Sequence, residues 1–177
     1  MFFSFSSLDI VSCERTSFTF GFKLSKFIFF IFYAKVEEVL SHDTISRDEK
    51  LKNICQLLQD NIAYYNWVGF YFANHENQTL HLGPYVGAET DHAVIPFGKG
   101  ICGQVAVSNE NFVVPDVAAQ DNYIACSFTV KSEIVVPLFL NGENIGQIDI
   151  DSHVIDPFSE ADERFLEFVN EEVAKLF

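Results

Sequence analysis

The segment SEIVVPLFLNGENIGQIDIDS, residues 132–152, carries the clearest strand pattern of the chain. Two runs rich in β-branched and large apolar residues, Glu133–Leu140 and Gly146–Asp151, flank the turn Asn141-Gly142-Glu143-Asn144. Asn-Gly is among the strongest hairpin signals, because both residues accept the left-handed backbone that a tight turn requires. The segment therefore predicts an antiparallel hairpin.

A second hairpin is predicted earlier in the chain. Trp67–Phe72 and Thr79–Leu82 are rich in residues that favour strands, and the polar stretch Ala73–Gln78 between them is typical of a hairpin loop. A further short strand is predicted at Asn111–Val114. The loop of residues 115–127 has no apolar period, and loops of this length in a compact domain are usually functional.

Helices are predicted at both ends of the body and once in its middle. Ser46 and Glu49 resemble a capping box in front of a run with helical apolar spacing. Residues 101–107 predict a short helix, and a closing helix is predicted from Glu160. The order helix, hairpin, mixed middle, hairpin, helix predicts an α+β sandwich with a central antiparallel sheet and flanking helices.

The first 34 residues differ from the rest in composition. Residues 1–33 hold 10 of the 20 Phe of the chain. The apolar run of residues 27–34 follows two lysines like a signal peptide, but it is far shorter than the roughly 20 residues that span a bilayer. We expect residues 1–34 to lie outside the fold, as an artefact of a misplaced start or as a targeting segment, and residues 35–177 to form one domain.

Charge and cysteine content narrow the classes of function. The formal net charge is -14, so a nucleic acid is not expected as a partner. The four cysteines are widely spaced and show no CxxC or Cys/His ligand pattern, so neither a disulfide scaffold nor a metal site is expected. This usage favours a reducing compartment, and we expect a cytoplasmic protein without stable membrane association.

The candidate chemistry lies in the second half of the chain. Cys102 and Cys126 stand 24 residues apart, and a thiol that attacks a substrate needs a second thiol to discharge it. Glu133, Asp149 and Asp151 fall in segments that otherwise read as buried strands, where an acid without a basic partner is costly. The structural alternatives are a small buried residue in a loop for Cys126, tight helix packing for Cys102, and a cap or a salt bridge for the three acids.

Five motifs follow one another along the second half of the chain: Gly98–Gly103, Val114–Val117, Ile124–Cys126, Ser132–Pro137 and Ile148–Ser152. In this order they resemble the GAF-domain family of free methionine-R-sulfoxide reductases, and the resemblance covers roughly residues 36–177. It implies a GAF-like fold, a homodimer, and reduction of free L-methionine-(R)-sulfoxide to L-methionine.

The resemblance also assigns residues to roles. Cys126 would attack the sulfoxide and Cys102 would resolve the resulting sulfenic acid as a disulfide, which thioredoxin or another dithiol would reset without a bound cofactor. The substrate pocket would be lined by Trp67, Tyr71, Glu133, Asp149 and Asp151. For Trp67 and Tyr71, a place in the core is the alternative.

One position departs from the family pattern. A further cysteine usually stands ten residues before Cys102, where this chain has His92. If that cysteine were obligatory, turnover would fail or become slow. The alternatives are therefore a non-catalytic GAF sensor that binds a small molecule, and a redox sensor in which Cys102 and Cys126 form a regulatory disulfide.

Overall fold

A computed structural model describes residues 26–120 and 129–177 of the chain, and it has the predicted α+β architecture. Within these residues the strands form one antiparallel sheet of six strands in the order β3-β2-β1-β6-β5-β4. Both predicted hairpins are confirmed, and they adjoin because β1 pairs with β6. The strands are β1 (Trp67–Asn74), β2 (Thr79–Val86), β3 (Val94–Pro96), β4 (Phe112–Val114), β5 (Ser132–Leu140) and β6 (Glu143–Ser152).

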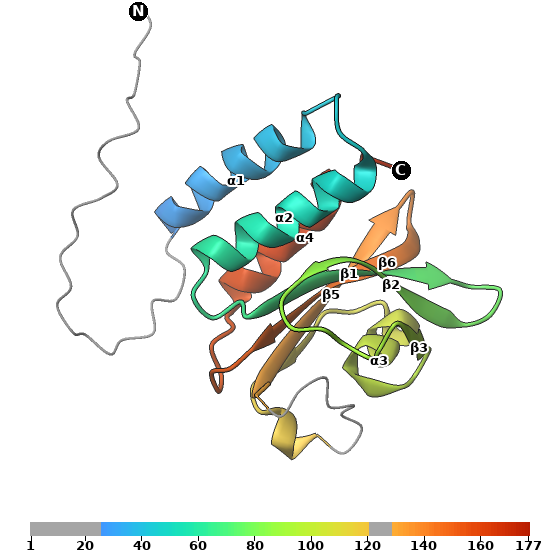
Figure 1. The fold of residues 1–177 in the computed structure, drawn as a ribbon. Coiled ribbons are helices and arrows are strands. Elements are labelled where there is room, and N and C mark those ends of the chain that lie inside the picture. Colours follow the sequence, from blue (N-terminus) through green and yellow to red (C-terminus); the bar gives the residue numbers. More distant parts are fainter. Residues whose placement is uncertain (1–25, 121–128) are drawn as a thin grey trace, which may run out of the picture.

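Helices cover both faces of this sheet (Figure 1). The first face carries α1 (Lys26–Leu40), α2 (Arg47–Asn61) and α4 (Glu160–Ala174), and the second carries α3 (Gly100–Ser108) and the short 3-10 helix η1 (Val117–Ala119). The predicted capping box of α2 is confirmed, because the Ser46 hydroxyl accepts a hydrogen bond from the Glu49 amide while the Glu49 side chain accepts one from the Ser46 amide.

Strand alternation divides the sheet into an aliphatic face and a face that bears the candidate site. Val68 and Phe70 of β1, with Ile148 and Ile150 of β6, are fully buried against α1, α2 and α4. Because successive side chains of a strand point to opposite faces, the residues between them face α3 instead. That second face carries a smaller apolar cluster around α3.

The start of the fold differs from the prediction. We expected residues 1–34 to lie outside the domain, but α1 already begins at Lys26. Phe32 is buried, and its ring centroid lies 5.9 Å from that of Phe165 in α4. Tyr33 packs edge-on against Phe168 at 4.2 Å. The change in composition at Lys35 therefore falls inside a packed helix. Phe32 and Tyr33 belong to the apolar run that resembles a leader, and they also pack against α4.

None of the helices in residues 26–120 and 129–177 has both the length and the apolar character needed to cross a membrane.

Candidate active site

Helix α3 places Cys102 over the second face of the sheet. Gly103 allows this close approach, because a Cβ atom there would lie 2.5 Å from the carbonyl oxygen of Pro96. The Gly98 amide donates to the carbonyl oxygen of Gly103 at 2.6 Å, which ties the loop to the first turn of the helix. Cys102 is consequently buried, with its side chain directed at β5 and β6.

Three carboxyl groups lie on the same face, in positions fixed by strand register. Glu133 of β5 stands directly opposite Asp151 of β6, and Asp151 stands opposite Trp67 of β1. Asp149 lies opposite Gly69, one step along the same face. The prediction that Asp149 and Asp151 face the same side of a strand is confirmed, and each of the three acids is at most 4 % exposed.

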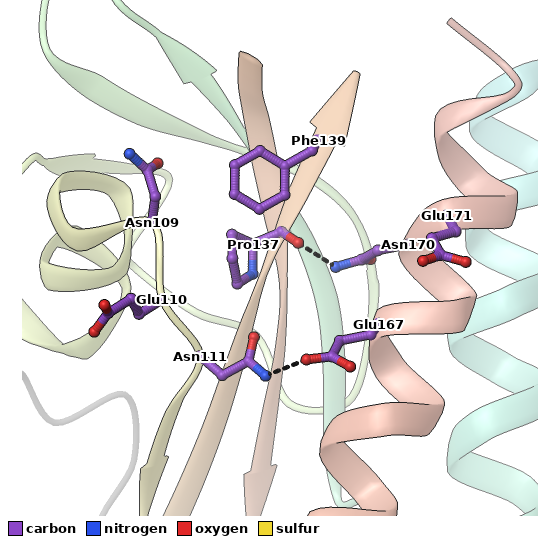
Figure 2. A pocket seen from close by; sticks show the side chains of 8 residues that line it. All are labelled: Asn109, Glu110, Asn111, Pro137, Phe139, Glu167, Asn170 and Glu171. Atoms are coloured by element: carbon purple, nitrogen blue, oxygen red, sulfur yellow. Dashed lines mark hydrogen bonds between the residues drawn. The ribbon is translucent and has the colours of Figure 1, made fainter. Parts of the chain in front are cut away.

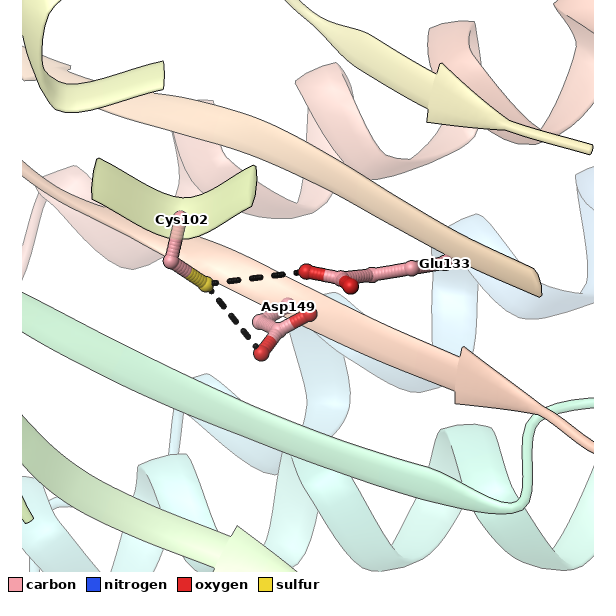
Figure 3. Close-up of side chains that lie close together, drawn as sticks. All are labelled: Cys102, Glu133 and Asp149. Carbon is pink, nitrogen blue, oxygen red and sulfur yellow. Dashed lines mark hydrogen bonds between the residues drawn. The ribbon is translucent and has the colours of Figure 1, made fainter. Parts of the chain in front are cut away.

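Cys102 is hydrogen-bonded to two of these acids (Figure 3). Its Sγ lies 3.3 Å from Oδ2 of Asp149 and 3.9 Å from Oε1 of Glu133, in geometry suited to S–H donation. The structure therefore brings together the thiol and the acids that the sequence analysis placed in one pocket.

Burial controls the protonation of this cluster. It raises the pKa of Asp149 to about 7, against the hydrogen bond from Cys102, which lowers it. The pKa of Glu133 lies well above its usual range, first because of burial and then because of the charges of Asp149 and Asp151. Burial, followed by the charge of Asp149, also raises the pKa of Asp151. Near neutral pH the cluster can therefore hold protons on its carboxyl groups.

Two oxygens of the cluster have unused hydrogen-bonding capacity. Among the described residues, Oδ1 of Asp149 and Oδ1 of Asp151 are buried without a hydrogen-bond partner. In that same part of the chain no lysine or arginine forms an ion pair with either acid. An unsatisfied buried polar atom costs about 1–3 kcal/mol, so these oxygens are well suited to accept hydrogen bonds from a bound ligand.

Trp67 and Tyr71 form an aromatic wall beside the acids. The Trp67 ring lies over Gly69, where a Cβ atom would come within 2.3 Å of it, and stacks on Tyr85 with centroids 5.3 Å apart. The polar ends of both predicted pocket residues donate to carbonyl oxygens of residues 87–93, Trp67 Nε1 to Ala88 at 3.1 Å and the Tyr71 hydroxyl to His92 at 3.1 Å. Of the two cavities that adjoin the acids, Trp67 lines one, whereas the fully buried Tyr71 lines neither.

Two small cavities adjoin the cluster. One of about 10 Å³, roughly the space of a single water molecule, is lined by Cys102, Glu133 and Asp149 together with His92 and Lys99. The other, of about 90 Å³, is lined by Trp67, Asp151 and neighbouring residues. From the sequence, His92 was noted only because it stands where the family usually has a cysteine. Its place in the wall beside Cys102 depends on the path of residues 87–93, which periodicity does not predict.

The thiol and two acids also have the spacing of a metal site, because Sγ of Cys102 and carboxylate oxygens of Glu133 and Asp149 lie within 4.8 Å of one another. A metal ion would require all three groups to be deprotonated. Burial raises the pKa of both carboxyl groups, and the charges of Asp149 and Asp151 raise the pKa of Glu133 further, so the donor set fits proton transfer better than metal binding.

A larger groove lies away from the cluster, between α4 and the end of β5 (Figure 2). It has about 490 Å³ of free volume but includes no thiol. The Asn170 amide donates to the carbonyl oxygens of Val136 and Pro137, at 2.9 and 3.0 Å, and so joins the helix to the strand. The lining residues are Asn109, Glu110, Asn111, Pro137, Phe139, Glu167, Asn170 and Glu171.

Cys126, which the resemblance makes the attacking thiol, lies outside the described residues. Its role therefore stays a prediction, as do the substrate contacts of the pocket residues.

Comparison with known proteins agrees with this geometry. A family model described as a GAF domain matches residues 44–176. The free methionine-R-sulfoxide reductase of Escherichia coli is 40% identical over 116 residues, 66% of this chain and 68% of that protein. The Saccharomyces cerevisiae protein of the same name is 45% identical over 104 residues, 58% of this chain and 57% of that protein.

A solved structure extends the similarity to the whole domain. The X-ray structure of free methionine-R-sulfoxide reductase from Neisseria meningitidis, in complex with its substrate, matches with a TM-score of 0.80 at 34% identity, covering 88% of this chain and 93% of that one. The six-stranded sheet and the matching family model define the GAF fold. The chain belongs to the GAF-domain family of free methionine-R-sulfoxide reductases.

Proposed function

We propose that this protein reduces free L-methionine-(R)-sulfoxide to L-methionine, with Cys126 as the attacking thiol and Cys102 as the resolving thiol. The observation that carries the proposal is the buried cluster in which the Cys102 thiol lies 3.3 Å from Asp149 and 3.9 Å from Glu133. Sulfoxide reduction requires a thiol and a proton donor within one dry site, and this cluster supplies groups of both kinds.

The first step forms methionine and a sulfenic acid. The Cys126 thiol attacks the sulfoxide sulfur, the oxygen passes to the cysteine sulfur, and methionine leaves with its sulfur reduced. A carboxyl group that is protonated at neutral pH can stabilise the oxygen by donating a proton to it. Asp149 suits this role, because its pKa is raised to about 7.

The second step closes the catalytic cycle. The Cys102 thiol attacks the sulfenic sulfur, the S–O bond breaks, and a disulfide and one water molecule form. A dithiol such as thioredoxin then reduces the disulfide and becomes oxidised itself. These steps need no bound cofactor. We also propose that the protein is cytoplasmic and that it forms a homodimer.

The substrate would lie between the acids and the aromatic wall. Asp151 and Asp149 have buried oxygens that can accept hydrogen bonds from the ammonium group of the amino acid. Trp67 and Tyr71 offer ring surface to the methyl end of the substrate. A buried carboxylate and an ammonium group favour a free amino acid over a methionine residue within a protein chain.

Substitution of single cysteines tests the two thiol roles. Cys126→Ser is expected to abolish methionine release. Cys102→Ser is expected to spare the first stoichiometric release but to block the thioredoxin-driven cycle. Cys55→Ser is the matched control, because Cys55 is buried beside Pro84 away from the cluster and should leave turnover intact. Multiple turnovers by Cys126→Ser would reject the assignment.

A further inference from the structure

His92 and Cys102 line the same small cavity, although they stand on different elements. The cavity holds about 10 Å³, and the titratable or charged groups that face it are His92, Lys99, Cys102, Glu133 and Asp149. Cys102 and the two acids are at most 5 % exposed, whereas His92 is only partly buried and Lys99 is exposed.

The backbone of His92 is held in place independently of its ring. Its carbonyl oxygen accepts a hydrogen bond from the Tyr71 hydroxyl at 3.1 Å, and its amide donates to the Thr90 hydroxyl at 3.2 Å. A substitution of the side chain therefore leaves both hydrogen bonds available. The ring can then be changed without removing the support of the cavity wall.

A reactive Cys102 faces an electrostatic problem. The thiolate is the nucleophilic form of cysteine, but two carboxyl groups lie within hydrogen-bonding distance of this sulfur. If Asp149 took the thiol proton, the negative charge on sulfur would remain buried with no positive charge formed beside it, which is costly. A base that becomes positively charged on taking the proton would leave the pair neutral overall.

We propose that His92 is the base for Cys102: its imidazole takes the thiol proton across the shared cavity and then stabilises the thiolate as an imidazolium. Histidine is suited to this role, because its side chain ordinarily changes charge between pH 5 and 8. Lysine is ordinarily already protonated there, so Lys99 can add positive charge but cannot take the proton.

This inference rests on the proposed function for its role in turnover. When Cys102 attacks the sulfenic acid of the other cysteine, an S–S bond forms and an S–O bond breaks. The departing hydroxide takes the proton from the imidazolium and leaves as water. The position of the family cysteine is thus occupied by a residue that increases the reactivity of the remaining resolving thiol.

The test follows Cys102 itself and needs no sulfoxide. Reduced full-length protein is treated with iodoacetamide between pH 5 and 9, and alkylation of the Cys102 peptide is timed by mass spectrometry. In this reaction an S–C bond forms, iodide leaves, and the thiol proton passes to the imidazole. His92→Gln is expected to slow alkylation at pH 7 about tenfold, because the thiol then lacks the base that takes its proton.

A second histidine separates this effect from a general loss of structure. His81→Gln changes a histidine on β2 that contacts Thr79, and it is expected to leave the alkylation rate unchanged. Equal alkylation rates in His92→Gln and the unaltered protein would overturn the proposal. Loss of methionine release with the alkylation effect intact would count against the proposed function alone.

Discussion

Asp149 is the residue at which chemistry and stability conflict most directly. Its pKa is raised from 3.8 to about 7 by burial, so between these pH values the folded protein binds a proton that the unfolded chain releases. The free energy of unfolding therefore falls as pH rises through this window, by roughly 4 kcal/mol. The raised pKa thus lowers the stability of the folded protein at neutral pH, and it also leaves a carboxyl group that can donate a proton there.

Replacing this carboxyl group should flatten the pH dependence of stability. For Asp149→Asn, the free energy of unfolding is expected to fall less between pH 4 and 7 than in the unaltered protein. Urea titration followed by the fluorescence of Trp67, the single tryptophan of the chain, measures this difference. Asp60→Asn, at an exposed acid bonded to Gln56, should keep the original slope. An unchanged slope in Asp149→Asn would contradict the assigned burial effect.

The shared face of Asp149 and Asp151 could be predicted from the sequence, whereas the groups around them could not. Alternation along a strand is local, so the shared face of Asp149 and Asp151 followed from their spacing. That Glu133 lies opposite Asp151, and that Cys102 covers Asp149, depends on strand register and on helix placement. Those are long-range properties, which a single sequence without a periodic signal does not specify.

At the scale of elements, the two capping boxes differ in how much of the fold they support. Both close the first turn of a helix, α2 through Glu49 and α4 through Asp162. Glu49 is exposed, whereas Asp162 is fully buried and also accepts hydrogen bonds from the hydroxyls of Tyr64 and Tyr65, at 2.8 and 3.1 Å. Asp162 therefore joins α4 to the connection between α2 and β1.

Neutralising these two acids should have unequal effects. Asp162→Ala is expected to lower the free energy of unfolding by about 3 kcal/mol or more, because it removes the acceptor of the buried Tyr65 hydroxyl and of the Ser159 amide. Glu49→Ala should cost about 1 kcal/mol or less. Chemical denaturation of both variants measures the difference, and equal losses would mean that the buried hydroxyl contacts contribute little.

Elements with a strong local signal were predicted and those without one were missed. The Asn-Gly turn, the capping box and the helical apolar spacing each reflect interactions within a few residues. Strand β3 is three residues long and pairs with β2 only through Thr79–His81, so no period marks it. The expected domain boundary at Lys35 falls inside α1, because the apolar run before it resembles a leader as well as a helix.

For the whole molecule, the position of α1 decides where the domain starts. The test compares two truncated chains, one that begins at Lys26 and keeps α1, and one that begins at Lys35 and lacks the first part of that helix. A chain beginning at Lys35 should be less stable by about 3 kcal/mol or more, since it loses the buried Phe32 ring and the contact of Tyr33 with Phe168. Urea unfolding of the two truncated chains tests this. Equal stability of the two chains would mean that the domain begins at Lys35, as composition alone suggests.

The fold could be predicted from the sequence with little ambiguity, whereas the activity could not. Two hairpins in one antiparallel sheet with helices on both faces follow from local patterns. A GAF fold also serves non-catalytic binding, so the activity depends on the particular thiols and acids of one face.

The most direct measurement is the release of methionine from the separate R and S epimers of free L-methionine sulfoxide by the full-length protein. Dithiothreitol and then thioredoxin serve as reductant. We expect repeated turnover of the R epimer with both reductants, and no release from the S epimer. Folded protein that releases no methionine from the R epimer with either reductant would contradict the proposed reductase activity, and a sensor role without catalysis would then explain the fold better.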